Sequence, residues 1–141
     1  MSLIRRLGTR AMLGTANVHP ILLAKDLGQA KAFYHGKLGL DVLGESDHKI
    51  EFRCGGGTKL AVSKSTVGTA DSQTQIGWEV DSVEAEVDDL RSRGVKVEDY
   101  DLPGLKTEDG IADVGFARMA WIIDPGNNAL AIVELKPQRG Q

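Results

Sequence analysis

The segments that decide the fold are residues 26–39, DLGQAKAFYHGKLG, and residues 81–94, DSVEAEVDDLRSRG. Asp26 can cap the N-terminus of the first helix and Asp81-Ser82 that of the second, and both segments end with a glycine, which commonly closes a helix. The two aspartates are separated by 55 positions, and so are the two glycines. Apolar residues recur three and four positions apart within each segment, so each predicts an amphipathic helix. The matching offset indicates that one structural unit occurs twice in the chain.

Extended segments surround both predicted helices. Apolar and β-branched runs precede the helices at 17–25 and 74–80. Three further extended segments follow each helix: 41–46, 49–53 and 58–63 in the first half, and 95–100, 114–123 and 129–135 in the second. Each half therefore predicts the order βαβββ, and the short turns between later strands favour antiparallel pairing. We expect an α+β fold whose helices cover one face of the sheets and leave the other face open.

The length of 141 residues predicts a single domain. The first fifteen residues carry three arginines and no acid, which predicts a flexible extension, a transit peptide or a segment upstream of a start at Met12. The last five residues show no apolar periodicity and predict a short tail. The expected limits are an N-terminal extension at 1–15, a domain at 16–136 made of module one (16–66) and module two (72–136), and a C-terminal tail at 137–141.

Composition narrows the classes of function. The chain is 41% hydrophobic and 26% charged, and it has no apolar run near the ~18 residues that a membrane span requires. The net charge of −3 and the few aromatic residues argue against a nucleic-acid partner. The single Cys54 cannot form a disulfide within the chain, which fits a cytoplasmic protein. This thiol is either buried and inert or a nucleophile assisted by a base such as His48.

Several short motifs follow one another in an order that is typical of one family. Along the chain they are His19, Lys25-Asp26-Leu27 with Ala32-Phe33-Tyr34, Leu38-Gly39-Leu40, and the turn Asp124-Pro125-Gly126-Asn127. In this order the sequence resembles the vicinal oxygen chelate superfamily, which contains glyoxalase I, bleomycin-resistance proteins and extradiol dioxygenases. The resemblance implies two βαβββ modules that form a cup-shaped, mostly antiparallel mixed sheet with helices on its outer face. It also implies a ligand or metal in the cup and, in many members, a homodimer.

The resemblance further implies positions for metal ligands on the first and last strands of each module. His19 and Gln75 stand at the first-strand positions, whereas Ala61 and Ala131 occupy the two carboxylate positions. Alanine offers no donor atom, and a neutral imidazole with one amide leaves the charge of a divalent cation unbalanced. Strand alternation places Glu79 on the face of Gln75, so His19, Gln75 and Glu79 are the candidate ligands for Ni, Zn, Fe or Mn. We otherwise expect no cofactor.

Candidate contacts for an organic ligand extend beyond these positions. Residues 99–113 lack strand or helix periodicity, and a segment of this length predicts either a lid over the cup or a solvated surface loop. Trp121 offers a large apolar surface on a strand near the cup. Two arginines on strands are either counter-ions for an anionic ligand or ordinary exposed residues. The candidate ligand contacts are His19, Gln75, Trp121, Tyr100, Lys106, Arg53 and Arg118.

Three functions are compatible with these residues. The first is binding of a small organic molecule in the cup without the full metal site, where small side chains at Ala61 and Ala131 enlarge the cavity. The second is a metal-dependent enzyme of the family, with lyase, isomerase or dioxygenase chemistry on a substrate that has vicinal oxygens. The third is a dimeric interaction module whose cup is filled by side chains. The absence of donors at the two alanines favours the first function.

Overall fold

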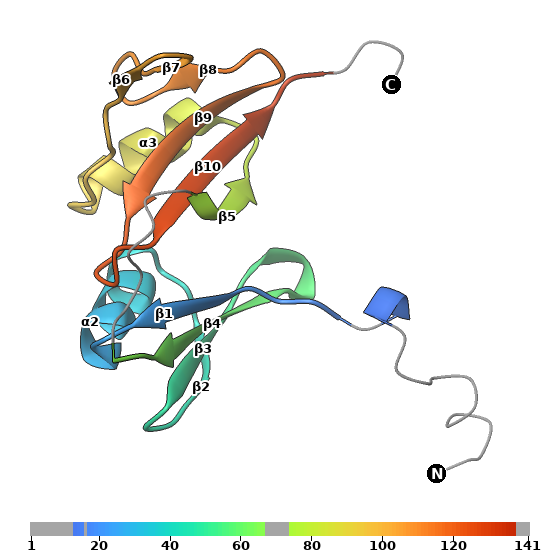
Figure 1. Ribbon diagram of the computed structural model, residues 1–141, viewed down its shortest axis with the longest axis vertical. Coiled ribbons are helices and arrows are strands. Elements are labelled where there is room, and N and C mark those ends of the chain that lie inside the picture. Colours follow the sequence, from blue (N-terminus) through green and yellow to red (C-terminus); the bar gives the residue numbers. More distant parts are fainter. Residues whose placement is uncertain (1–12, 16, 67–73, 138–141) are drawn as a thin grey trace.

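The computed structural model describes residues 13–15, 17–66 and 74–137, and it contains two βαβββ modules, one above the other in Figure 1. The predicted fold class is confirmed. Apart from the short 3-10 turn η1 (Leu13–Thr15), the expected N-terminal extension lies outside the described residues, as does nearly all of the expected tail. None of the described helices combines the length and the apolar character needed to cross a membrane.

Module one is a four-stranded sheet with a helix packed on one face. Its strands are β1 (Ile21–Ala24), β2 (Val42–Glu45), β3 (Lys49–Arg53) and β4 (Lys59–Lys64). They lie in the order β1-β4-β3-β2, with β1 parallel to β4 and the other pairs antiparallel. The 3-10 turn η3 (Gly55–Gly57) joins β3 to β4, so the three glycines form a strand connection.

Module two repeats this order around a second sheet. Its elements are β5 (Thr74–Glu79), α3 (Val83–Ser92), β6 (Asp101–Leu102), β7 (Leu105–Lys106), β8 (Ala112–Asp113), β9 (Ala117–Ile123) and β10 (Ala129–Leu135). The main sheet has the order β5-β10-β9-β8, in which β5 is parallel to β10 and the other pairs are antiparallel. Strands β6 and β7 form a separate hairpin.

Local sequence explains where both helices begin and end. The side chains of Asp26 and Ser82 each accept a hydrogen bond from the backbone N–H three residues further on, at 3.0 and 3.2 Å. These bonds satisfy N–H groups that have no partner inside the helix. After the helices, Gly39 and Gly94 adopt φ angles of 78° and 79°, which a side chain disfavours. The second helix therefore repeats both signals of the first, with its capping side chain 56 positions after Asp26 and its closing glycine 55 positions after Gly39.

The first helix is not the uniform α-helix that its apolar spacing predicts. The α-helix α2 (Leu27–Lys31) continues as the π-helix η2 (Ala32–Lys37). The backbone N–H of Leu38 donates to the carbonyl of Phe33 at 2.9 Å, a spacing of five residues that widens the turn. Phe33 and Tyr34, which are consecutive on this wider turn, are both buried. Their rings are in T-shaped contact, with the ring centroids 5.0 Å apart.

The segment between α3 and β9 also differs from the prediction. Residues 95–100 form no strand and meet β9 through one backbone bond, from Glu98 N to Trp121 O at 2.8 Å. Residues 99–113, expected to lack regular structure, contain the β6–β7 hairpin and β8. A turn at Gly110, whose φ is 82°, returns the chain to the edge of β9. The conformation of this segment therefore depends on pairing with a strand that is distant in the sequence, and not on local periodicity.

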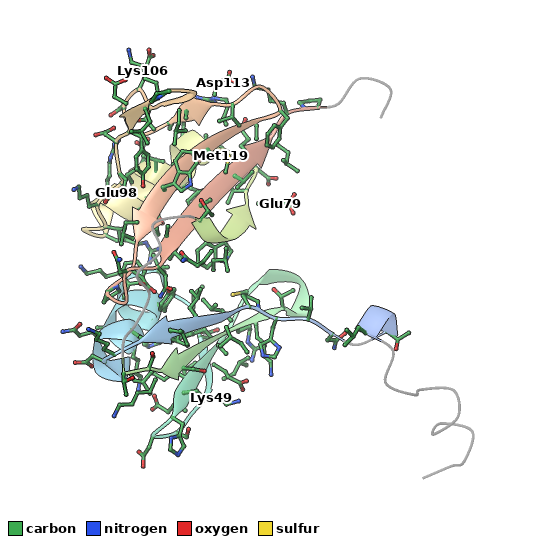
Figure 2. The ribbon with its side chains drawn as sticks, in the orientation of Figure 1. Lys49, Glu79, Glu98, Lys106, Asp113 and Met119 are labelled. Carbon is green, nitrogen blue, oxygen red and sulfur yellow. The ribbon has the colours of Figure 1, made fainter. Side chains whose placement is uncertain are left out.

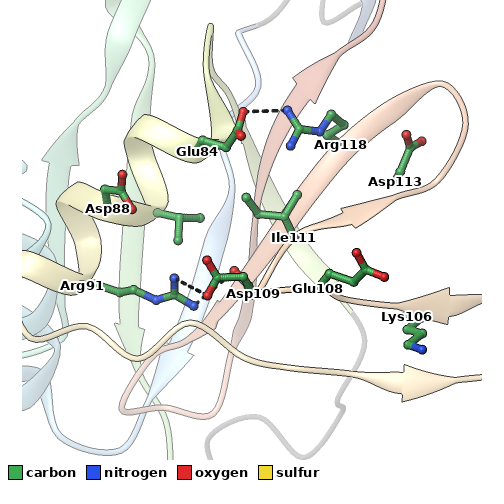
Figure 3. A pocket seen from close by; sticks show the side chains of 10 residues that line it. Glu84, Asp88, Arg91, Lys106, Glu108, Asp109, Ile111, Asp113 and Arg118 are labelled. Atoms are coloured by element: carbon green, nitrogen blue, oxygen red, sulfur yellow. Dashed lines mark hydrogen bonds and ion pairs between the residues drawn. The ribbon is translucent and has the colours of Figure 1, made fainter.

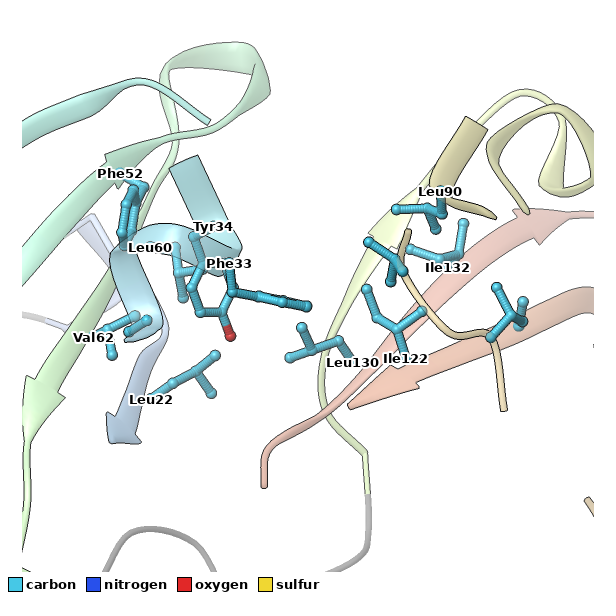
Figure 4. Close-up of a cluster of buried hydrophobic side chains, with 14 of the residues drawn as sticks. Leu22, Phe33, Tyr34, Phe52, Leu60, Val62, Leu90, Ile122, Leu130 and Ile132 are labelled. Carbon is cyan, nitrogen blue, oxygen red and sulfur yellow. The ribbon is translucent and has the colours of Figure 1, made fainter. Parts of the chain in front are cut away.

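One buried core spans both modules. The helix-facing side chains of β1, β3 and β4 and the first helix meet those of α3, β9 and β10 (Figure 4). Tyr34, Phe52, Leu60, Ile122 and Leu130 are among the most deeply buried large side chains. Burying a side chain of this kind contributes roughly 1.5–3 kcal/mol. The modules therefore stabilise one another as parts of a single folding unit.

A buried polar contact joins the modules at residues 124–128, which we call the junction turn. The Tyr34 hydroxyl of module one donates to Oδ2 of Asp124 in module two. The backbone N–H of Asn128 donates to Asp124 Oδ1 at 2.8 Å, and its side-chain Nδ2 donates to Oδ2 at 2.8 Å. The same Nδ2 also donates to the carbonyl of Leu23 on β1 at 2.9 Å. The junction turn thus docks module two on module one.

Tyr34 should make the protein less stable at alkaline pH. Burial, followed by the nearby Asp124 carboxylate, raises the pKa of Tyr34 well above its usual range. Because an unfolded tyrosine ionises near pH ~10, this stabilisation is complete below that pH and is lost as the pH rises above it. We expect the free energy of unfolding, measured by urea denaturation, to fall above about pH 10, and Tyr34→Phe to reduce that slope. Equal slopes in the two proteins would contradict this role of Tyr34.

Candidate functional site

We use the term cup face for the open side of each sheet, opposite the helices. On β1, Leu22 and Ala24 are buried toward the helices, whereas Ile21 and Leu23 are 59% and 38% exposed on the cup face. His19 precedes this strand and is partly exposed. Neighbouring residues of a strand point to opposite faces, which accounts for this alternation along β1. Apolar side chains of module one therefore remain accessible in the single chain.

Glu51 places a carboxylate on the cup face of module one. The register of β3 and β4 pairs it with Ala61, one of the positions that the family resemblance assigns to a metal ligand. Its Oε2 lies 3.1 Å from Nζ of Lys59 and 3.5 Å from Nζ of Lys49. The hydrogen bond from Lys59 lowers the pKa of Glu51. This carboxylate is ionised at neutral pH and already engaged by two ammonium groups, and Arg53 lies exposed at the end of the same strand.

An apolar and aromatic cluster covers the cup face of module two. Trp121 is 7% exposed and packs with Ala131 and Tyr100; the two aromatic rings are in T-shaped contact, with centroids 5.6 Å apart. Nε1 of Trp121 donates to Oγ1 of Thr74 at 3.0 Å, which holds the indole in place. Met119 lies beside these side chains on β9 (Figure 2). We call this set the cup-face cluster; it presents the kind of surface that binds planar organic molecules.

The three metal candidates do not meet within one chain. Gln75 Oε1 accepts a hydrogen bond from Ala129 N at 2.6 Å, where the pairing of β5 and β10 shifts register. Glu79 is exposed at the end of β5, and His19 belongs to the other module. Among the residues that the structure describes, no three histidine, cysteine, aspartate or glutamate side chains gather as a metal site would require. Within the described part of a single chain, His19, Gln75 and Glu79 therefore do not form one metal site.

Two of the positively charged residues that were candidate ligand contacts, Arg118 and Lys106, lie on the helix side of module two. Nη1 of Arg118 donates to Glu84 on α3 at 2.8 Å, and this bond raises the pKa of Arg118. Lys106 lines a polar cavity of about 580 Å³ against α3, together with Arg91 and Asp109 (Figure 3). Within residues 99–113, the structure therefore brings Tyr100 to the cup-face cluster and Lys106 to a different surface.

A second cavity, the intermodule cleft, has a volume of about 270 Å³. Leu38 and Leu40 of module one form one side, and Trp78 and Leu90 of module two form the other. Neither cavity includes a residue of the cup-face cluster. This cleft could not be recognised along the sequence, because its walls come from segments far apart in the chain. The available signal was the apolar pair that follows the first helix, together with a strand alternation that turns Trp78 toward the helices.

Cys54 lies next to this cleft and is half-buried. Burial raises the pKa of its thiol, and a hydrogen bond with the Trp78 side chain opposes that effect only in part. A thiol with a raised pKa is a poor nucleophile at neutral pH. The structure therefore favours the inert thiol over the nucleophile.

The fold is shared with solved structures of antibiotic-binding and resistance proteins. The antibiotic-binding protein TnmS3 from Streptomyces sp. CB03234 is 22% identical, with a TM-score of 0.65 over 89% of this chain and 100% of that chain. A bleomycin-binding protein solved with bleomycin is 17% identical, with a TM-score of 0.66 over 86% and 100%. The fosfomycin resistance protein FosX from Listeria monocytogenes, solved with Mn(II) and a sulfate ion, is 14% identical, with a TM-score of 0.63 over 86% and 91%. A comparison with curated proteins finds no match.

The family itself is shown by the sequence. The profile of the Glyoxalase/Bleomycin resistance protein/Dioxygenase superfamily matches residues 17–132. This range covers both modules, from the segment before β1 to the middle of β10. The agreement between this match and the observed topology leads to one conclusion: the chain belongs to the glyoxalase/bleomycin resistance protein/dioxygenase superfamily.

Proposed function

We propose that this chain binds a small planar or aromatic organic molecule at its cup face. The observation that carries the proposal is the pair of Trp121 and Tyr100 over Ala131, which offers an aromatic wall beside a small side chain. Small-molecule sites are typically lined by apolar and aromatic side chains with few polar groups. Two proteins with this fold, described as antibiotic-binding and bleomycin-binding, support the same class of ligand.

The available donors support binding without a resident metal. Ala61 and Ala131 are 2% and 1% exposed and offer no donor atom at the positions where the family resemblance implies carboxylates. Glu51, the carboxylate beside Ala61, is held by two lysines. Members of this superfamily can hold a divalent cation, as FosX does with Mn(II). In this chain Ala131 instead packs among apolar and aromatic side chains of the cup face.

We also propose that the protein acts in the cytoplasm as a homodimer that completes the cup. Ile21 and Leu23 leave apolar surface exposed on the cup face of module one. A second copy that covered this surface would bury it and enclose the ligand, as symmetric dimers commonly do. The single Cys54 is consistent with a reducing compartment. The mass in solution, measured by light scattering, tests the dimer.

The ligand proposal predicts a specific role for Trp121. We expect bleomycin or members of a panel of planar aromatic compounds to raise the melting temperature by mass action. Trp121→Ala should weaken that binding roughly tenfold or more, because buried aromatic anchors carry much of the binding energy. Trp121→Phe should retain part of it. The matched control is Phe116→Ala, which changes an exposed aromatic side chain outside the cup-face cluster and outside the cavities described above, and should leave the affinity unchanged.

A metal titration separates this proposal from the enzyme alternative. Protein prepared without chelator is titrated with nickel, zinc, iron and manganese, and we expect no stoichiometric uptake. Stoichiometric uptake that disappears in His19→Ala would overturn the proposal in favour of a metal-dependent enzyme. If neither metal nor any panel compound binds, the interaction module with a filled cup becomes the better assignment.

A further inference from the structure

The intermodule cleft has the properties of a second binding site. It lies on the helix side of the sheets, with Ile122 and Ile132 at its base. Its neighbours along the strands, Trp121 and Ala131, point to the opposite side and belong to the cup-face cluster. Figure 4 shows the two base residues with Leu90, where module two faces module one. The cleft is therefore separated from the cup by the thickness of the sheet.

Its size and lining suit one small aromatic ring. A dry cavity of about 150 Å³ lined by Leu, Ile and Phe is large enough for benzene. The cleft offers about 270 Å³, so it has room for a ring and a short side chain. Leu38 and Leu40 supply apolar contacts, and Trp78 supplies an aromatic face.

The charge at the edge of the cleft selects for a cation. Three charged residues of α3 line the cleft at helical spacing: Glu86, Asp89 and Arg93. Arg93 Nε lies 3.0 Å from Asp89 Oδ2, so these two charges balance each other. Within the described residues Glu86 has no ion-pair partner. Glu79 at the end of β5 also lines the cleft and likewise has no ion-pair partner among the described residues. Two carboxylates, Glu86 and Glu79, therefore remain available beside an apolar and aromatic cavity.

We propose that the intermodule cleft binds a small aromatic amine, with its ring against Trp78 and the two leucines and its ammonium group at Glu86. The tryptophan face attracts both rings and cations, and the carboxylate supplies a charge-assisted hydrogen bond. Because the walls belong to both modules, a bound amine also strengthens their contact. This site is independent of the cup ligand.

The probe is 2-phenylethylammonium, and the readout is the pair of indole N–H signals in the NMR spectrum of the full chain. We expect the Trp78 signal to shift in a saturable way at millimolar probe, while the Trp121 signal stays in place and serves as an internal reference for the cup. The neutral analogue 2-phenylethanol and the anion 3-phenylpropionate should bind more weakly, in that order. A shift of Trp121 alone, or equal binding of the three compounds, would overturn the proposal.

Two substitutions on α3 test whether the Glu86 carboxylate binds the ammonium group. Glu86→Gln keeps the size of the side chain and should weaken binding of the amine roughly fivefold. The expected loss is small because an exposed ion pair contributes little binding energy. The same change should leave 2-phenylethanol binding unaltered. The matched control is Asp88→Asn, an equivalent change on the same helix at a residue that lines the other cavity. Equal loss of amine binding in both variants would show a general effect of charge and would also overturn the proposal.

Discussion

Replacement of Asp124 by alanine is expected to lower the free energy of unfolding by roughly 3–5 kcal/mol. The carboxylate accepts hydrogen bonds from the Tyr34 hydroxyl and from the backbone and side chain of Asn128. Alanine removes all of these acceptors at once. Tyr34 is 0% and Asn128 1% exposed, so water cannot take over the role of the carboxylate. The loss is a large share of the ~5–15 kcal/mol that stabilises a typical domain.

Urea denaturation of the variant and the parent protein measures this loss. The matched control is Asp26→Ala, which removes an exposed helix cap and should cost only about 1 kcal/mol. The loss of stability in Tyr34→Phe should fall between these two values, because Asn128 still donates hydrogen bonds to the Asp124 carboxylate. If Asp124→Ala cost no more than Asp26→Ala, the junction turn would not be the polar link between the modules.

Gly126→Ala is the second change with a large expected effect, a loss of roughly 2–4 kcal/mol. An added Cβ would lie 2.5 Å from the carbonyl oxygen of Leu23 and 3.3 Å from the Cα of Ala24. Both are backbone atoms of β1, so no side-chain rotation can relieve the contact. The junction turn must move away from β1, which weakens the 2.9 Å bond from Asn128 to Leu23.

The control for this prediction is another glycine in a less crowded place. Gly44 on β2 has no neighbour within 4 Å of an added Cβ and no positive φ, so Gly44→Ala should change stability by no more than about 0.5 kcal/mol. Amide shifts of residues on β1, measured by NMR, should change in Gly126→Ala and not in Gly44→Ala. Equal stability of the two variants would contradict the close approach of the junction turn to module one.

The elements with strong local signals were predicted with good boundaries. Asp26 with Gly39 marks the limits of the first helix, and Ser82, the second residue of the predicted Asp81-Ser82 cap, marks those of the second with Gly94. Strands β3 and β10 have the predicted limits, because each is an extended run bounded by turn residues. The segment 95–113 was predicted less well, since its residues take their conformation from the edge of β9 and from the turn at Gly110.

The candidate site likewise contains features that could be predicted from the sequence and features that could not. The family resemblance singled out Ala61 and Ala131 as positions without donor atoms, and both are buried in the structure. It could not show that Gln75 bonds to a backbone N–H at a register shift, because that shift depends on how β5 and β10 pair.

By itself, the sequence determined the duplicated βαβββ unit and the family, and with the family resemblance it predicts that Ala61 and Ala131 leave a metal site without two of its donors. Helix caps, turn residues and strand alternation act over a few positions, so they can be recognised along the chain. Only the tertiary structure decided which side chains meet across the modules. The bond from Tyr34 to Asp124 joins residues 90 positions apart, and the intermodule cleft likewise combines distant segments. Such contacts depend on close packing in three dimensions, which a periodic pattern does not encode.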